Sequence, residues 1–203
     1  MSLIIACCGS KKAVIGGDKR SITFIGSCSQ LEDELYTGRI RTDEDLKARA
    51  VELGACLQVS DGREKVWRRG DLLVGEVTEI SAERQKRRRI YLAPGAFIIT
   101  DINDSDARIT SRGRASCLIL GNRLTRDLAS RSIRDFASKG FDDKVIDDIF
   151  KDISSKTASV SQEHTILSSA VKHTDPEAEV LNALAEDCRA SGWKLDLCSI
   201  DRQ

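Results

Sequence analysis

Residues 2–21 read SLIIACCGSKKAVIGGDKRS, and this stretch gives the strongest indication of the fold. Residues 3–8 are almost wholly apolar and end at Gly-Ser-Lys-Lys, a pattern typical of a strand that is buried on both faces. Residues 13–17 form a second apolar run after that turn, so the two runs are expected to pair as a hairpin. Residues 21–25 then alternate polar and apolar side chains, as a half-buried strand does.

Further along the chain, the spacing of apolar residues predicts two helices before a strand-rich middle and three helices after it. Helices are expected at residues 30–36, 43–53, 123–138, 142–156 and 177–190, the second with Thr42 as its N-cap. Strands are expected at residues 56–60, 65–68, 72–80, 89–92, 96–101, 115–120, 165–171 and 193–199, with one of the turns between them at Arg112-Gly113. Runs of strands next to paired helices predict an α+β fold, and no break in composition divides the chain, so residues 1–203 are expected to form one domain.

Composition excludes several classes of function. The 203 residues carry 32 basic and 32 acidic side chains, so no net charge attracts the protein to nucleic acid or to an anionic membrane. No apolar run approaches the ~18 residues of a membrane span, and the N-terminus lacks the pattern of a signal peptide. The 7 cysteines include no CxxC pair, which favours buried free thiols in the cytoplasm over a disulfide framework or a metal site. No cofactor motif is present, so neither a cofactor nor a metal is expected.

The first residues carry a resemblance to a known family. Ser2, the apolar run after it and the second run ending in Asp18-Lys19-Arg20 resemble the start of mature proteasome β-type subunits, which are N-terminal nucleophile (Ntn) hydrolases. The distance from Ser2 to Asp18 matches the family distance from nucleophile to aspartate without a gap. Residues 117–122 and 161–167 are more weakly similar to later parts of that family. The segment Gly-Gly-Asp-Lys-Arg also resembles an archaeal family of unknown function.

The resemblance implies a four-layer αββα sandwich, an amide hydrolase activity on a peptide or small amide, and a homo-oligomer. It implies catalytic roles for Ser2, Asp18 and Arg20, and an oxyanion hole from a backbone N–H near Gly121 or Asn122. Removal of Met1 would leave Ser2 with a hydroxyl and a free α-amine. Because an α-amine has a reference pKa near ~8, it can act as a base at neutral pH.

Two positions depart from the pattern of the resembled family. Glu34 aligns with the family's lysine beside the nucleophile, and Ala158 aligns with a later aspartate. A carboxylate beside the nucleophile would raise the pKa of the hydroxyl rather than lower it. The alternative hypothesis is therefore an inactive Ntn-fold protein that serves as an assembly or binding module.

Residues 83–89 form a dense basic run that includes Lys86, Arg87, Arg88 and Arg89. Such a run can bind phosphates, RNA or an acidic partner, or it can be a solvated loop between two strands. Aromatic residues that stack on bases are scarce near it, which favours the loop and makes nucleic acid an unlikely partner. The acidic residues 101–106 lack the downstream glycine and glutamate of an EF-hand and are expected to form a turn.

Overall fold

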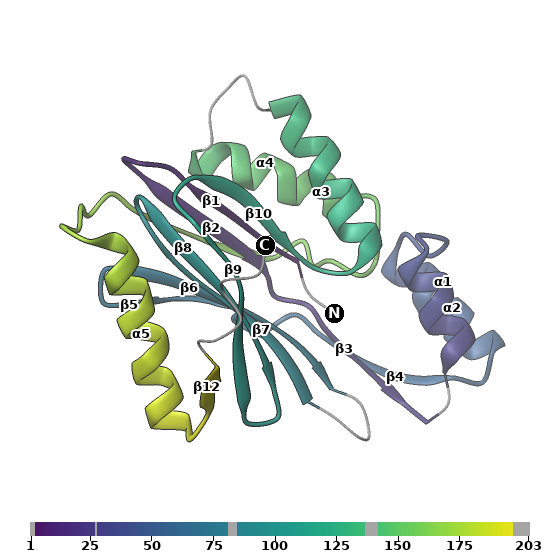
Figure 1. Ribbon diagram of the computed structural model, residues 1–203. Helices are drawn as coiled ribbons and strands as arrows, with labels where there is room; N and C mark the ends of the chain where they lie inside the picture. The colour runs from purple at the N-terminus through teal and green to yellow at the C-terminus, as the bar shows by residue number, and fades with distance from the viewer. Residues whose placement is uncertain (1–2, 27, 81–84, 137–141, 197–203) are drawn as a thin grey trace. The chain divides into compact units, whose positions relative to one another are not determined.

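The computed structural model describes residues 3–26, 28–80, 85–136 and 142–196, and the described residues form an α+β fold, as the sequence predicts (Figure 1). In chain order its elements are β1 (Ile4–Cys8), β2 (Ala13–Asp18), β3 (Ser21–Ile25), α1 (Ser29–Tyr36), α2 (Asp43–Glu52), β4 (Cys56–Ser60), β5 (Val66–Arg69), β6 (Leu72–Ile80), β7 (Gln85–Ala93), β8 (Ala96–Asn103), β9 (Asp106–Gly113), β10 (Ser116–Leu120), α3 (Arg123–Phe136), α4 (Asp143–Ser154), β11 (His164–Ser169), α5 (Pro176–Ser191) and β12 (Lys194–Asp196).

The first two strands lie at the centre of a four-stranded sheet with the order β10–β1–β2–β11. Every residue of β1 and β2 is buried, which is why both strands read as continuous apolar runs rather than as alternating ones. The backbone N–H of Asp18 donates to the carbonyl of Leu3 at 3.1 Å. This bond places the end of β2 beside the residue that precedes β1.

A six-stranded sheet with the order β12–β9–β8–β7–β6–β5 carries helix α5 along one face. Neighbouring strands from β5 to β9 are antiparallel, and β12 runs parallel to β9. Tyr91, Ile98 and Val180 belong to the apolar cluster that joins this sheet to the helix. Asp175 caps α5 at its start, and Gly192 ends it in the left-handed conformation with φ of 69°.

Strands β3 and β4 pair as a separate two-stranded antiparallel sheet, and helices α1 and α2 share an apolar cluster with it. Thr42 caps α2 through a capping box with Asp45, in which each side chain accepts a hydrogen bond from the other residue's backbone N–H. The expected N-cap at Thr42 is therefore confirmed. Leu31, Leu35 and Leu46 are the large buried side chains of this cluster.

Helix α4 presents its apolar stripe to β2 at a point where only glycine fits. A Cβ atom on Gly16 would lie 2.6 Å from the ring of Phe150 and 2.8 Å from the side chain of Ile146. The missing side chain allows the helix to approach the strand closely. The stripe predicted for residues 142–156 is buried as expected.

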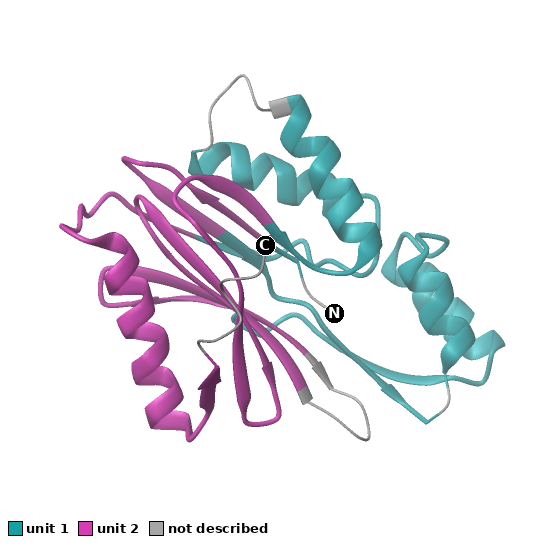
Figure 2. Cartoon of the chain, in the orientation of Figure 1, with its two compact units in different colours: residues 1–4, 16–65, 119–166 teal, residues 5–15, 66–118, 167–203 magenta. Residues whose placement is uncertain are grey.

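Two compact units emerge from the contacts along the chain (Figure 2). Unit 1 contains residues 1–4, 16–65 and 119–166, and unit 2 contains residues 5–15, 66–118 and 167–203. The single domain expected from the sequence stays a prediction.

The sequence missed one strand and part of another. Residues 106–113 form β9, although residues 101–106 and the pair Arg112-Gly113 had been expected to form turns. The turn is confined to Asp104 and Ser105, with Asp104 at φ of 55°. The apolar–polar alternation of β9 is weak because its last four residues, Thr-Ser-Arg-Gly, include no buried apolar side chain. Strand β7 begins at Gln85, four residues before the predicted start at residue 89.

Candidate active site

The carboxylate of Asp18 is the centre of the candidate site, and all of its described partners come from unit 1. Asp18 is completely buried at the end of β2. Its Oδ1 accepts from the backbone N–H of Leu3 at 2.6 Å, and its Oδ2 accepts from the backbone N–H of Arg20 at 2.9 Å. Ser2 lies outside the described residues, but Leu3 is covalently its neighbour. Asp18 thus holds the backbone one residue away from the predicted nucleophile.

A lysine that the sequence had not indicated completes the centre. Lys65 immediately precedes β5 and is only 2% exposed. Its Nζ donates to Oδ1 of Asp18 and to the backbone carbonyl of Arg20, each at 2.7 Å. Burial lowers the pKa of Lys65, while the neighbouring Asp18 carboxylate acts in the opposite direction. The result is a buried ammonium–carboxylate pair in which Lys65 Nζ and both carboxylate oxygens of Asp18 form hydrogen bonds.

Arg20, the third predicted catalytic residue, has its guanidinium bound by carboxylates and a backbone carbonyl. Its guanidinium pairs with Asp61 through two contacts of 2.8 Å, pairs with Asp43 and donates to the carbonyl of Ala158 at 2.7 Å. These contacts use all of the roughly five N–H donors that a guanidinium has. The carboxylates of Asp61 and Asp43 raise the pKa of Arg20, and Arg20 in turn lowers the pKa of Asp61. Arg20 therefore ties α2, the turn after β4 and the segment after α4 together, and its backbone carbonyl holds Lys65.

The two positions that depart from the family pattern, Glu34 and Ala158, each contact an arginine. Glu34 lies on α1 and pairs with Arg49 at 2.7 Å, which lowers the pKa of Glu34 to about 2. Because Ser2 lies outside the described residues, the expected effect of Glu34 on the pKa of its hydroxyl stays a prediction. Among the described residues, Lys65 places an ammonium beside Asp18. Ala158 contributes its carbonyl oxygen to Arg20, a contact that needs no side chain.

The turn at Gly121 and Asn122 joins β10 to α3. Asn122 Oδ1 accepts from the backbone N–H of Thr125 at 2.7 Å and so caps the helix. This bond fixes the orientation of the side-chain amide. Its Nδ2 is one of the buried polar atoms that have no hydrogen-bond partner among the described residues. A free amide donor is therefore present at the turn where the sequence predicts an oxyanion hole.

Residues 86–89 of the basic run do not form a solvated loop, which corrects that interpretation for the described part of the run. Lys86, Arg87, Arg88 and Arg89 belong to strand β7. Arg88 pairs with Asp101 on the neighbouring strand at 2.7 Å, and Arg89 pairs with Glu76 and Asp187. Arg87 and Arg89 also lie over the ring of Trp193 at 4.7 and 4.8 Å. Because sheet neighbours and α5 supply these partners, three of the four cations serve the packing of unit 2.

The described cysteines are all free thiols, as predicted, but Cys56 is exposed and Cys117 is half-buried. Cys56 is exposed because it begins β4, whose side chains mostly face solvent. Among the residues that the structure describes, no group of three or more His, Cys, Asp or Glu side chains is placed to hold a metal ion. In the same residues, no helix combines the length and apolar character needed to cross a membrane.

Comparisons with known proteins match a family model and several solved structures. A family model described as "Connectase MJ0548-like, N-terminal domain" matches residues 1–189. The crystal structure of eukaryotic HslV from Trypanosoma brucei aligns with a TM-score of 0.48 and 10% sequence identity, covering 83% of this chain and 99% of that one. The comparison with curated proteins gave no match.

Proposed function

The chain belongs to the Connectase MJ0548-like, N-terminal domain family, and from the geometry around Asp18 we propose that it is an N-terminal nucleophile enzyme that cleaves amide bonds through Ser2. Its substrate is a peptide or a small amide. The four-layer αββα sandwich, the single domain, the homo-oligomer and the cytoplasmic location are parts of the same proposal.

The observation that carries the proposal is the buried pair of Asp18 and Lys65, next to the backbone N–H of Leu3. A lysine that is 2% exposed pays a large desolvation cost, and burial does lower its pKa. A pair of this kind stabilises a fold poorly compared with apolar side chains, so we infer that it is kept for its charge beside residue 2.

In the proposed reaction, Met1 is removed and the α-amine of Ser2 takes the proton from its own hydroxyl as Oγ attacks the carbonyl carbon of the amide. The C–N bond of the amide then breaks, and the protonated α-amine returns that proton to the leaving nitrogen. An ester between Ser2 and the acyl group remains, which water hydrolyses by the same proton transfers. The Lys65 ammonium favours the alkoxide form of Ser2, and Asp18 orients the backbone that carries it.

The negative oxygen that forms on the substrate carbonyl needs a hydrogen-bond donor. The sequence led us to expect a backbone N–H near Gly121 or Asn122, and we retain that proposal. The unpaired Nδ2 of Asn122 is a further candidate, because a buried donor without a partner gains a hydrogen bond only when the oxyanion develops.

The mature N-terminus and its reactivity test the proposal. Intact mass spectrometry should show loss of Met1, and an electrophilic amide mimic such as a β-lactone should add to Ser2 as shown by peptide mapping. The Ser2→Ala variant should lose the adduct while keeping the melting temperature. The Lys65→Arg variant keeps a cation and should label more slowly, because a guanidinium does not fit the site of an ammonium.

The outcomes separate this function from the inactive module. Met1 retained in the folded protein would place the amine base one residue too far away and would support an assembly or binding role. Labelling of the Ser2→Ala variant at the same rate as the wild type would also contradict the proposal.

A further inference from the structure

A polar cavity of about 430 Å³ opens in unit 1 beside the candidate catalytic pair. It is lined by the start of α2, the turn after β4, the end of α4 and the segment that leads into β11. Arg20 connects it to the centre, because its guanidinium lines the cavity while its backbone carbonyl accepts from Lys65 at 2.7 Å. We propose that this cavity binds the cationic side chain of a peptide substrate, a lysine or an arginine.

The buried positive group of the cavity, the Arg20 guanidinium, is not available to an anion. The N–H donors of Arg20 are already taken by Asp43, Asp61 and Ala158, as described above. The N-terminus of α2 is closed by the capping box of Thr42, and its first turn contains three acidic residues. An anion entering here would face four carboxylates, and of the two lining arginines the exposed Arg41 would be left to pair with it.

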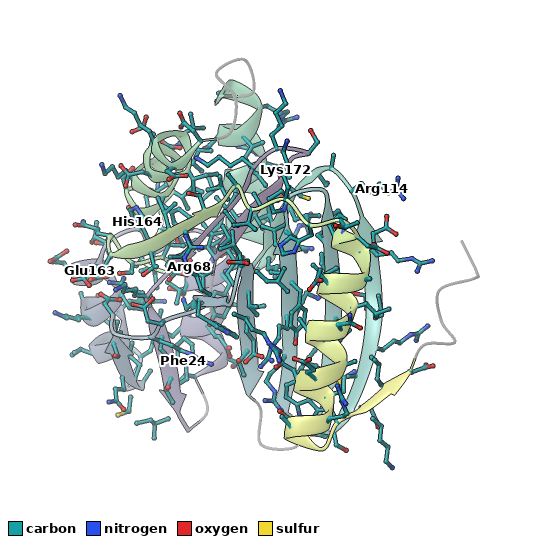
Figure 3. The ribbon with its side chains drawn as sticks, turned by 90° about the vertical axis from the view of Figure 1, so that its left-hand side faces the viewer. Phe24, Arg68, Arg114, Glu163, His164 and Lys172 are labelled. Carbon is teal, nitrogen blue, oxygen red and sulfur yellow. The ribbon has the colours of Figure 1, made fainter. Side chains whose placement is uncertain are left out.

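The negative groups, in contrast, are in excess and partly accessible. Two arginines and four carboxylates line the cavity, which leaves an excess of two negative charges. Arg20 lowers the pKa of Asp61, so this carboxylate is ionised at neutral pH. Glu44 and Glu163 are exposed at the cavity, and Figure 3 shows Glu163 where β11 begins. An ammonium or guanidinium group placed among these carboxylates would gain charge-assisted hydrogen bonds.

Hydroxyl groups rather than apolar side chains fill much of the remaining lining. Ser154, Ser155 and Ser161 contribute, and Ser161 is completely buried and bonded to the backbone N–H of Glu163 at 3.0 Å. Oxygen acceptors of this kind suit the several N–H donors of a basic side chain and offer little to an apolar one. The cavity thus favours a basic side chain over an apolar one, by its charge and by its hydrogen-bond acceptors.

The inference rests on the proposed function, since it names the substrate class of that site, but binding can be measured without catalysis. The ¹⁵N-labelled Ser2→Ala variant is titrated with Nα-acetyl-lysine amide, Nα-acetyl-norleucine amide and Nα-acetyl-glutamate amide, and backbone amide shifts are followed by NMR. The lysine probe should shift residues 41–44 and 154–163 and bind at least about fivefold more tightly than either other probe. Binding should weaken as salt rises.

Matched variants identify which carboxylates bind the lysine probe. Glu44→Gln and Glu163→Gln should each weaken the lysine probe about threefold, as expected for partly exposed ion pairs. Glu179→Gln, an exposed glutamate on α5 in unit 2, should leave binding unchanged. Equal binding of the norleucine probe, tighter binding of the glutamate probe or an equal effect of Glu179→Gln would overturn the inference.

The two proposals can fail separately. If Ser2 reacts with the β-lactone but the lysine probe has no preference for the cavity, the function stands and the inference is wrong. If the lysine probe binds as expected while Met1 is retained, the cavity is a cation site in a protein that is not an Ntn enzyme, and the inferred role in a substrate site is overturned.

Discussion

Replacing Lys65 by methionine should reveal how much the fold depends on the buried pair with Asp18. Methionine keeps the length and apolar stem of lysine but removes the ammonium and two hydrogen bonds of 2.7 Å, to Asp18 and to the carbonyl of Arg20. Hydrogen bonds to charged groups contribute about 1.5–3 kcal/mol each. Breaking one partner of a buried ion pair costs about 3–5 kcal/mol, because the remaining carboxylate is left without a counter-charge.

The second partner of the pair supplies the decisive comparison. In the Lys65→Met, Asp18→Asn double variant the unpaired carboxylate is gone, so part of the lost stability should return. We expect a coupling free energy of at least about 2 kcal/mol between the two positions.

Urea denaturation followed by far-ultraviolet circular dichroism measures these free energies of unfolding. Lys156→Met is the matched control, because Lys156 pairs with Asp152 at 2.6 Å in a pair whose side chains are 49% and 38% exposed. This exposed pair, whose lysine follows the end of α4, should contribute only about 0.2–1 kcal/mol. A loss below about 1 kcal/mol for Lys65→Met, or strict additivity in the double variant, would show that Lys65 and Asp18 do not form the buried pair described here.

Two further perturbations test the packing and the arginine cluster. Gly16→Ala should lower the free energy of unfolding by about 1–3 kcal/mol, because its Cβ would meet Phe150 at 2.6 Å, whereas Gly62→Ala, with 4.0 Å to its nearest neighbour, should be close to neutral in the same urea titration. Arg20 lowers the pKa of Asp61, so the stability that this carboxylate contributes is present above its unfolded pKa of about 3.9 and is lost as the pH falls through the lower folded pKa. The wild type should therefore lose more stability than Asp61→Asn between pH 5 and pH 2.5, and an equal loss would argue against this pairing.

Local pattern was sufficient for most elements of the fold. The strands at 21–25, 56–60 and 72–80 have the bounds predicted from the sequence, and Thr42 caps α2 as expected. These features depend on neighbours a few residues apart, whose spacing is written directly in the chain. Strand β9 was missed for the same reason, because its polar second half carries no local signal and is held by pairing with β8.

The candidate site shows where local reasoning stops. The resemblance of residues 2–21 led to Asp18 and Arg20, which the structure does bring together through a 2.9 Å hydrogen bond. It gave no indication of Lys65, which is 47 residues from Asp18 along the chain. Before the structure, Lys65 was only the first residue of an expected strand, and a lysine at such a position is ordinarily exposed.

The sequence by itself determined most of the helices and strands, the buried character of β1 and β2 and the position of Asp18 at the end of β2. All of these follow from apolar periodicity and turn residues over short distances. Only the tertiary structure decided which charges meet. Glu34 is neutralised by Arg49, and Lys65 takes the position beside Asp18. The physical reason is that a buried charge is stable only beside a counter-charge. That counter-charge need only be close in space, and it can lie at any distance along the sequence.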